Sequence, residues 1–436
     1  MDLLQVFRKN AFWFYDFLRG FDIRNHYRDI KQINEFPTSE FSKNKKAKYL
    51  SNILSHTLET TKFYKTYAKD TQLSDFPVIN KNLIRDNFDD FKSSKYKTKN
   101  CVLVSTSGST GAPFSVLQNM SKRCRNTGDN LYYSKKSGYE IGYELVYIKI
   151  WPDHIKRTLF SKDWIQNIVP QSVFKLEDDT IAEFIKKLEE STSKKSFLGY
   201  VSAFEKICKY LDKVNAKPIQ CNVHSIITIS EGLNAYTRNR MQKYFGVVPV
   251  SRYSNNENGI IAQEDGDDTR RFMINLASYH VEILHLDKDI PVTNGERGRI
   301  VVTDLHNYAM PLIRYDTGDI GSMDVGEKGV PFLTSIEGRK LDLIYNTSGD
   351  LVPSHISYKL CKYGEYKQFQ LIQYGEKEYL IKLNTDQKVD EEKMLLEYKE
   401  YLGQDANITI EYVDEIPLLS SGKRREVMNT YHSQFR

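Results

Sequence analysis

The chain has 436 residues, which exceeds one ordinary domain of roughly 100 to 200 residues and predicts two or three folded units. Lys and Arg total 62 against 57 Asp and Glu, so the formal charge of +5 is a small surplus over a large surface and indicates no nucleic-acid partner. The basic clusters at 43–48 and 92–99 are typical of solvated helix faces or loops and carry no prediction by themselves.

The five cysteines are scattered and include no CxxC pair, which argues against a disulfide framework and a structural zinc site. Cys221 and His224 stand three apart, but no second pair has ligand spacing, so we expect no protein-bound zinc. This cysteine usage fits a reducing cytosol, and we expect a cytoplasmic protein.

Residues 1–20 are apolar, but charged side chains interrupt them too often for a membrane span of about 20 residues, and they lack the order of a signal peptide. We therefore expect no transmembrane segment. An apolar stripe at helical spacing predicts an amphipathic helix: Leu3, Phe7, Ala11, Phe14 and Leu18. We expect this stripe to pack on the chain's own domain; a partner protein or a membrane surface is the alternative.

The pattern is helical to about residue 90, where 76–91 predicts a Pro-marked entry and an amphipathic helix. Buried strands are then expected at 101–106, 144–151 and 223–230, with helices at 180–190, 202–214 and 236–245. Strands that alternate with helices predict a mostly parallel sheet covered by helices. Strands crowd together at 277–286 and 298–304, which indicates a smaller antiparallel subdomain.

The last hundred or so residues predict a compact α+β unit. Strands are expected at 341–347, 368–375, 378–384 and 407–414, with a Gly-Asp turn after the first and a helix at 391–402. The fold class is therefore α/β, with a small α+β unit at the end of the chain.

Residues 102–114 read VLVSTSGSTGAPF and place Ser, Thr and Gly behind a short apolar run. A strand before such a loop and a helix after it can turn backbone N–H groups and hydroxyls inward, which makes a nest for phosphate oxygens. The spacing of a Walker loop is absent, so a P-loop NTPase is disfavoured. The stretch predicts phosphate binding rather than a flexible linker.

Four further motifs follow in order: SRYSNNENG at 251–259, MPLIRYDTGD at 310–319, IEGRKLDLI at 336–344 and PLLSSGKRREV at 417–427. With the loop, this series resembles the superfamily of adenylate-forming enzymes, which includes the acyl-CoA synthetases, over about residues 76–427. Within it the chain is most similar to the phenylacetate-CoA ligase-like branch, including the CapK-type proteins associated with capsular polysaccharide synthesis.

The resemblance implies a reaction in which a carboxylate attacks the α-phosphate of ATP and magnesium pyrophosphate leaves. Residues of the loop would wrap the β- and γ-phosphates: Thr106, Ser107, Gly108, Ser109, Thr110 and Gly111. Glu257, in the family's acidic position, would hold Mg²⁺. Tyr253 would lie against the adenine ring, which the backbone of Ser230, Glu231 and Gly232 would flank.

Asp319 closes the RYDTGD motif and would bind both ribose hydroxyls, because one carboxylate can accept both protons. Arg339 is expected to contact the same ribose or the phosphates. Lys423 matches the mobile lysine that reaches the carboxylate and the α-phosphate, where a fixed cation stabilises growing negative charge. A solvated or structural side chain is the alternative at each of these positions.

The resemblance also implies the domain organisation. Residues 1–338 would form an N-terminal adenylation domain with the ATP and acyl sites, built of mostly parallel sheets with helices and a small antiparallel or barrel subdomain. Residues 339–436 would form a small mobile lid domain that carries Lys423, with the boundary near Gly338 to Lys340. The lid would swing between two half-reactions.

Two departures from the family pattern bear on activity. Ala112 stands where many relatives carry Lys after the phosphate loop, and Leu341-Asp342 stands where a pair of acidic residues is usual. Adenylation survives the second change more readily than domain rotation, so thioester formation is the less secure step. The acyl pocket is expected near 151–154 and 198–204, where His154 would orient the carboxylate or serve structure alone; the acid is not identified.

Three functions stay open. The leading hypothesis is an ATP-dependent ligase that activates a carboxylic acid as acyl-AMP and passes the acyl group to CoA. The second passes it to a carrier-protein thiol or an amine, for example on a sugar precursor. The third is a non-catalytic nucleotide-binding homologue within a polysaccharide assembly, which Ala112 and Leu341 favour and the retained motif residues oppose. A homodimer also stays open.

Overall fold

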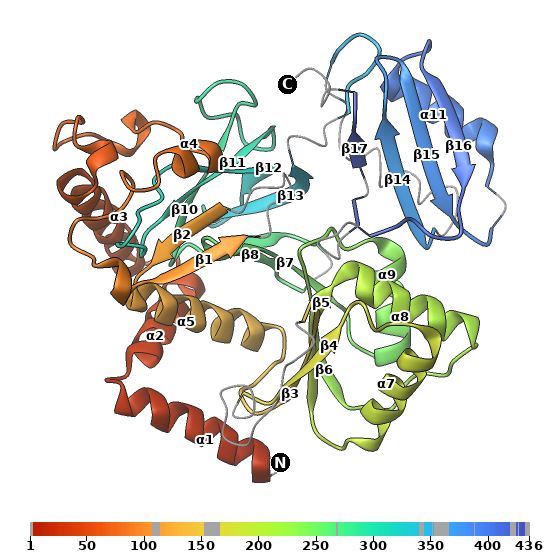
Figure 1. The fold of residues 1–436 in the computed structure, drawn as a ribbon, viewed down its shortest axis with the longest axis horizontal. Helices are drawn as coiled ribbons and strands as arrows, with labels where there is room; N and C mark the ends of the chain where they lie inside the picture. Colours follow the sequence, from red (N-terminus) through yellow and green to blue (C-terminus); the bar gives the residue numbers. More distant parts are fainter. Residues whose placement is uncertain are drawn as a thin grey trace.

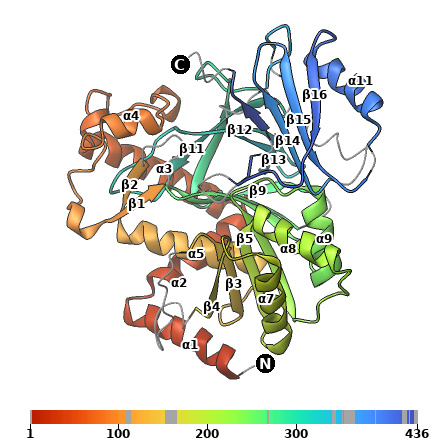
Figure 2. The same cartoon turned by 45° about the vertical axis from the view of Figure 1, so that its right-hand side comes forward.

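The computed structural model describes residues 3–106, 114–151, 166–266, 269–339, 344–350, 352, 366–387, 389–418, 424–425 and 427–431. A large unit is built on one curled sheet, with the N-terminal helices on one side of it and α7, α8 and α9 on the other (Figure 1). A small C-terminal unit lies beside α8 and α9, and the turned view shows the same neighbourhood (Figure 2).

The predicted N-terminal helix is present as α1 (Leu3–Leu18), but it faces the opposite way from the expectation. Its apolar stripe is exposed, with Phe14 61% and Leu18 65% accessible. The side chains on its buried face are mostly polar: Gln5, Arg8, Phe12 and Asp16. Asp16 explains the orientation, because its carboxylate accepts the backbone N–H groups of Ile23 and Arg24 at the start of α2. The expectation that the stripe packs on its own domain is wrong.

Helices fill most of the first 90 residues, as predicted. They are α2 (Asp22–Glu35), α3 (Glu40–Thr60) and the short α4 (Lys81–Asp86). Side-chain caps start two of them: Ser39 accepts the N–H of Ser42 before α3, and Asn80 accepts the N–H of Leu83 before α4. Asn80 is the N-cap of α4 and thus fixes the start of the helix at Lys81.

The phosphate-loop sequence lies in a hairpin rather than between a strand and a helix. Among the described strands, β1 (Val102–Thr106) pairs with β2 (Phe114–Gln118) alone, in antiparallel register from Val102 opposite Gln118 to Thr106 opposite Phe114. Leu103 is 57% exposed, so the prediction of a buried strand here is wrong. A two-stranded sheet can leave one face in water. The expected helix, α5 (Met120–Lys136), begins only after β2.

Eleven strands form the main sheet, in the order β10-β11-β12-β13-β9-β8-β7-β6-β5-β3-β4. The parallel half consists of β4 (Ile168–Ser172), β3 (Glu144–Lys149), β5 (Lys195–Tyr200), β6 (Val223–Ile229) and β7 (Val250–Asn255). Three helices provide its crossovers: α7 (Asp178–Glu190), α8 (Val201–Lys213) and α9 (Ala235–Phe245). The prediction of parallel strands covered by helices is confirmed.

A tight turn after β7 reverses the chain, and the antiparallel half of the same sheet begins there. Its strands are β8 (Gly259–Glu264), β9 (Phe272–Ile274), β10 (Tyr279–Leu284), β11 (Arg297–Asp304), β12 (Tyr315–Val325) and β13 (Pro331–Arg339). The expected antiparallel subdomain is therefore continuous with the parallel sheet. The carboxyl ends of β6 and β7 bring 230–232 and 256–258 to one edge, where α/β sheets bind ligands.

The C-terminal unit has its own four-stranded sheet, in the order β16-β15-β14-β17. The strands are β14 (Gln368–Gln373), β15 (Glu378–Asn384), β16 (Asn407–Tyr412) and β17 (Val427–Asn429), and α11 (Glu391–Leu402) packs on them around a separate apolar core. Residues 344–347 do not continue a strand as expected; the N–H of Tyr345 instead donates to the side chain of Gln373. The boundary at Gly338 to Lys340 remains a prediction.

Buried ion pairs fasten α5 to its neighbours. The ammonium of Lys122 lies 2.7 Å from the carboxylate of Asp304 at the end of β11, and neither side chain is exposed. One turn later, Arg125 donates to Asp29 on α2 at 2.6 Å and to Ser278 at 2.9 Å. These contacts join the helix to both the sheet and the N-terminal helices.

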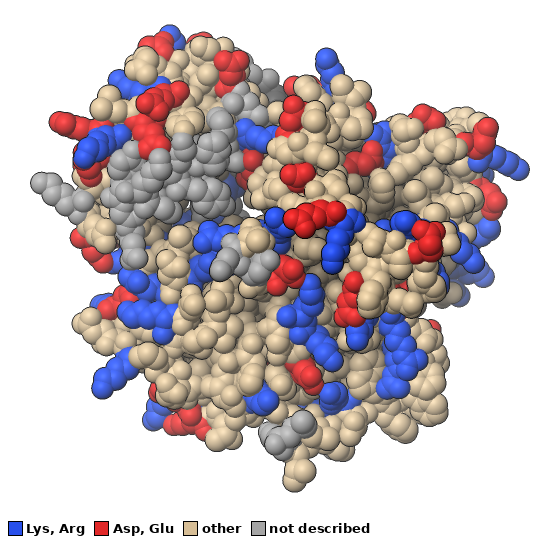
Figure 3. Space-filling view, turned by 180° about the vertical axis from the view of Figure 1, so that it is seen from behind, with Lys and Arg blue, Asp and Glu red and all other residues tan. Residues whose placement is uncertain are grey.

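Charge is dispersed rather than gathered on the rear face of the molecule, where basic and acidic side chains are interspersed (Figure 3). None of the helices in the described ranges combines the length and hydropathy that a membrane crossing requires.

We predict that Lys122→Met lowers the free energy of unfolding by about 3–5 kcal/mol, because the buried Asp304 loses its cation. Urea unfolding followed by circular dichroism measures the change. Lys187→Met is the matched control, since Lys187 pairs with Glu183 on an exposed helix face and should change stability by about 0.5 kcal/mol or less. Equal effects of the two substitutions would contradict the prediction.

Candidate active site

Three side chains of β12 reach across the curl of the sheet toward β7 and the turn that follows it. Tyr315, Thr317 and Asp319 occupy alternate positions of the RYDTGD motif, which is the spacing that places strand side chains on one face. Between the last two, Gly318 takes a φ of 82°, a conformation that favours glycine. The motif therefore presents a phenol, a hydroxyl and a carboxylate to the same region.

Glu257 is the buried charge of this region, with 1% of its side chain exposed. It lies in the turn between β7 and β8, where Gln118 of β2 donates to its backbone carbonyl at 2.8 Å. The hydroxyl of Tyr315 donates to its Oε1 at 2.6 Å. No described residue donates a hydrogen bond to its other oxygen, Oε2, which is also buried. One carboxylate oxygen is therefore open to a further partner.

Lys81 is the cation nearest to this carboxylate in the described part of the chain. Its Nζ lies 3.2 Å from Oε1 of Glu257 and 5.8 Å from the ring centroid of Phe114, the first described residue after the phosphate loop. The side chain is about a third exposed, so it can move without unfolding its surroundings. α4 thus brings a lysine to the region that the loop and Glu257 share.

The fit of Glu257 to Mg²⁺ follows from its unpaired oxygen. Mg²⁺ takes hard oxygen ligands and is commonly held by one or two carboxylates together with substrate phosphates. A buried carboxylate oxygen without a donor matches that requirement, and the phosphate-loop hairpin lies beside it. Within the described ranges, no three His, Cys, Asp or Glu side chains gather into a metal site, so protein ligands alone do not surround an ion here.

Tyr253 and Asp319 form the second feature of the site. The hydroxyl of Tyr253 donates to Oδ2 of Asp319 at 2.7 Å, and it lies 3.2 Å from the hydroxyl of Thr317. Burial raises the pKa of Tyr253 well above its usual value, and the charge of Asp319 adds to the effect, so the phenol stays a donor. Tyr253 is 9% exposed; the structure places its hydroxyl on the carboxylate predicted to bind ribose.

Asp319 and Arg339, both predicted to contact the nucleotide, occupy paired backbone positions. They are directly opposite each other in the antiparallel pair of β12 and β13. Opposite residues in such a pair have side chains about 5 Å apart at their bases. The side chain of Arg339 is outside the description, so its role stays a prediction.

The phosphate loop is described only at its ends. Thr106 ends β1, whereas Ser107, Gly108, Ser109, Thr110, Gly111 and Ala112 lie outside the described residues. The backbone carbonyl of Ser105 accepts from Asn256 at 3.3 Å, which ties the start of the loop to the residue before Glu257. The end of β1 and the proposed metal carboxylate are therefore neighbours.

The stretch predicted to flank adenine follows β6. Ser230 has a φ of 72°, a left-handed conformation that turns the chain sharply out of the strand. Glu231 points away from solvent: its Oε2 accepts the N–H of Ser202 at 2.8 Å, and its Oε1 accepts the N–H of Arg424 from the C-terminal unit. Gly232 is exposed. Glu231 therefore joins the two units.

Three earlier predictions fall outside the described residues: Lys423, His154 and the Leu341-Asp342 pair. The neighbouring residues are described. Trp151 donates its indole N–H to the carbonyl of Tyr147, and 198–204 spans the junction of β5 and α8.

Sequence reasoning missed several residues of the site. Tyr315 and Thr317 stand in the RYDTGD motif that was recognised, and the two-residue spacing to Asp319 could have identified them. Lys81 and Arg424 carry no local signal, because each acts on a carboxylate that is distant in the sequence.

Two sequence comparisons relate the chain to CapK proteins. Residues 344–430 match the family model of the CapK C-terminal domain. The C-terminal part of the chain is therefore similar to the CapK C-terminal domain. Over 434 residues it is 21% identical to Protein CapK of Staphylococcus aureus, across 93% of this chain and 92% of that protein.

Solved structures agree on the fold. A crystal structure of 2-hydroxyisobutyryl-CoA ligase in the postadenylation state, in complex with R3-HIB-AMP, has a TM-score of 0.69 at 15% identity and covers 91% of this chain and 92% of its own. The same ligase in the thioesterification state has a TM-score of 0.57 at 16% identity, with 92% of each chain covered. ATP-bound MatB from Rhodopseudomonas palustris has a TM-score of 0.51 at 17% identity, covering 79% and 69%.

The chain has the adenylate-forming ligase fold, and the predicted fold class is confirmed. The residues that match this family model include the unit around β14–β17, which lies next to α8 and α9.

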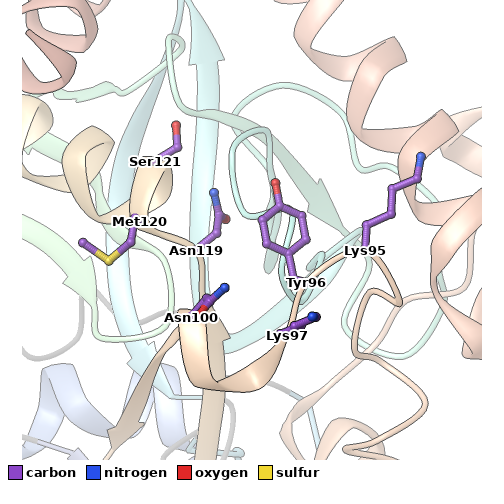
Figure 4. Close-up of a pocket in the computed structure, with 7 residues that line it drawn as sticks. All are labelled: Lys95, Tyr96, Lys97, Asn100, Asn119, Met120 and Ser121. Carbon is purple, nitrogen blue, oxygen red and sulfur yellow. The ribbon is translucent and has the colours of Figure 1, made fainter. Parts of the chain in front are cut away.

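One hollow of the surface lies apart from these residues. Figure 4 shows it between the segment before β1 and the start of α5. It is lined by Lys95, Tyr96, Lys97, Asn100, Asn119, Met120 and Ser121. Among the described residues, no predicted site residue lines this hollow.

We predict that Tyr315→Phe lowers the free energy of unfolding by about 1.5–3 kcal/mol, because a buried carboxylate loses a charge-assisted hydrogen bond. Urea unfolding measures the effect. Tyr64→Phe is the matched control, since the hydroxyl of Tyr64 is buried with no hydrogen-bond partner among the described residues and its removal should cost nothing. A loss in Tyr64→Phe as large as that in Tyr315→Phe would overturn the assignment.

Proposed function

We propose that the chain is an ATP-dependent ligase that activates a carboxylic acid as its acyl adenylate and transfers the acyl group to coenzyme A. The observation that carries the proposal is the buried carboxylate of Glu257, with one oxygen unpaired among the described residues, beside the Tyr253–Asp319 pair. A metal-bound triphosphate and a ribose are the groups that fit a lone buried carboxylate and a fixed second one.

In the first half-reaction, an oxygen of the substrate carboxylate attacks the α-phosphorus of ATP. The bond from that phosphorus to the bridging oxygen breaks, and pyrophosphate leaves with the electron pair. Such a displacement depends chiefly on positioning and charge neutralisation. Glu257 would hold Mg²⁺, which supplies positive charge to the phosphate oxygens when bound. Lys81 supplies a second cation within reach of the same region.

Asp319 would accept the ribose hydroxyls, and the hydroxyl of Tyr253 holds that carboxylate in one orientation. Arg339, opposite Asp319 on β13, would contact the ribose or the phosphates. Lys423 would reach the substrate carboxylate and the α-phosphate from the C-terminal unit. The work is thus divided between a fixed nucleotide site on the large unit and a lysine on the small one.

In the second half-reaction, the thiol sulfur of coenzyme A attacks the acyl carbon, and AMP leaves. A carrier-protein thiol or an amine, as in polysaccharide biosynthesis, would use the same first half-reaction with a different acceptor. The likeness in fold to acyl-CoA ligases favours coenzyme A as the acceptor. We place this reaction in the cytoplasm, the compartment that supplies both ATP and coenzyme A.

We expect carboxylate-dependent exchange of labelled pyrophosphate into ATP when the chain is tested with aryl, fatty, hydroxy and amino acids. Thioester formation on addition of coenzyme A would establish the acceptor. Exchange without thioester would favour the carrier-protein or amine alternative. A chain that binds ATP but exchanges no pyrophosphate with any acid would be the non-catalytic homologue.

Lys423→Ala should lower the exchange rate by about 100-fold or more and leave ATP affinity within a few-fold, because the lysine acts on charge that develops in the transition state. Exchange kinetics and calorimetry of ATP binding separate the two effects. Lys393→Ala is the control, since Lys393 is exposed and pairs with Asp390 on the same unit. Unchanged exchange in Lys423→Ala would remove this lysine from the mechanism.

A further inference from the structure

One arginine of the C-terminal unit reaches two carboxylates of the large unit. The guanidinium of Arg424 donates to Glu205 on α8 at 2.9 Å, and the backbone N–H of the same residue donates to Glu231. Within its own unit, Arg424 is held by the carbonyl of Ile416 at 2.8 Å and by Glu415 at 2.6 Å. The side chain is therefore fixed on both sides of the contact.

The contact is buried, which distinguishes it from the surface ion pairs of the molecule. The side chains of Arg424 and Glu205 are 8% and 4% exposed, whereas Glu415 is 52% exposed. Burial raises the pKa of Glu205 and of Glu231, and the positive charge of Arg424 opposes that rise. Buried charges of this kind are stable only while they are paired. Separation of the two units would take the guanidinium from Glu205 and the backbone N–H donor of Arg424 from Glu231.

The position of Arg424 connects this contact to both halves of the proposed site. It directly follows Lys423, the proposed catalytic lysine, and it binds Glu231, which lies in the stretch predicted to flank adenine. Lys423 is joined to Arg424 by one peptide bond, and consecutive α-carbons of a chain are 3.8 Å apart. The contact of Arg424 with the large unit is therefore one residue away from the proposed catalytic lysine.

We propose that Arg424 is a positioning residue that latches the C-terminal unit to Glu205 and Glu231 and so places Lys423 for adenylation. The proposal rests on the proposed function. The domain arrangement agrees with it, since the chain resembles 2-hydroxyisobutyryl-CoA ligase in the postadenylation state, with a TM-score of 0.69, more than in the thioesterification state, at 0.57. The latch must release before the small unit rotates for acyl transfer.

Glu205 has a second cation partner, so it stays paired when Arg424 leaves it. Lys209, one helical turn from Glu205 on α8, lies 3.4 Å from the same Oε1 atom that Arg424 binds. The side-chain amide of Asn234 also donates to the other carboxylate oxygen of Glu205, Oε2, at 3.2 Å. Glu205 thus keeps a cation and a hydrogen bond when Arg424 departs, which avoids the cost of an isolated buried charge. The latch can open without destabilising α8.

The first test separates the half-reactions. In Arg424→Met, pyrophosphate exchange with the best acid of the panel should fall about 100-fold, as expected for a misplaced catalytic group. Thioester formation from a supplied acyl adenylate should be unchanged or faster. Arg424→Lys should restore part of the exchange. Glu415→Gln, which removes the negative charge of the exposed partner of the same guanidinium, should change either rate by no more than about 3-fold. Equal losses in both half-reactions would indicate a merely structural role and overturn the proposal.

The second test does not depend on activity. Spin labels introduced through unnatural amino acids at Lys186 on α7 and Leu396 on α11 would report the distance between the units; both positions are exposed. We expect a single distance in the full chain and a broader distribution in Arg424→Met. An unchanged distribution would overturn the latch, even where the full chain shows exchange. If no acid supports exchange, the proposed function is contradicted. The distance measurement still tests the latch in that case, because it does not depend on activity.

Discussion

Burial of the Glu257 carboxylate is the constraint on which the rest of the site depends. A charge withdrawn from water is costly unless donors or cations replace its solvation. Tyr315 and Lys81 supply part of that replacement at one oxygen, and the other oxygen has no hydrogen-bond donor among the described residues. The turn that follows β7 is therefore incomplete on its own. It needs β12 on one side and α4 on another, and its free oxygen can take a further cation, as in the proposed function.

This requirement couples the two ends of the proposed nucleotide site. Because Tyr315 must lie on Glu257, the register of β12 also sets where Thr317 and Asp319 lie on the same face. Tyr253 then closes the arrangement from β7, the strand that also carries the turn with Glu257. The carboxylate proposed for magnesium and the one proposed for ribose are consequently held by the same two strands, and neither can shift without the other.

Sequence predicted the parts of this arrangement that local patterns encode. Alternating strands and helices indicated the parallel half of the sheet, and the order of motifs indicated the adenylate-forming fold, both of which are confirmed. Helical periodicity also identified the apolar stripe on α1. Periodicity shows which residues share one face of the helix, but it does not show which face packs against the rest of the protein. The capping demand of Asp16 decided that orientation. Lys81 and Arg424 escaped prediction for a similar reason, since their partners are set by the tertiary fold.

Two buried carboxylates of the large unit, Asp304 and Glu205, illustrate how an ion pair can be permanent or reversible. Lys122 and Asp304 are both fully enclosed, so separating them would expose an uncompensated charge in the core, and α5 is fixed as a result. Glu205 faces two cations from different units, Arg424 and Lys209, and retains one when the other leaves. A carboxylate with a second cation partner lowers the free-energy cost of separating it from the first. An interface built on such a carboxylate can be specific in its closed state and still open within a catalytic cycle.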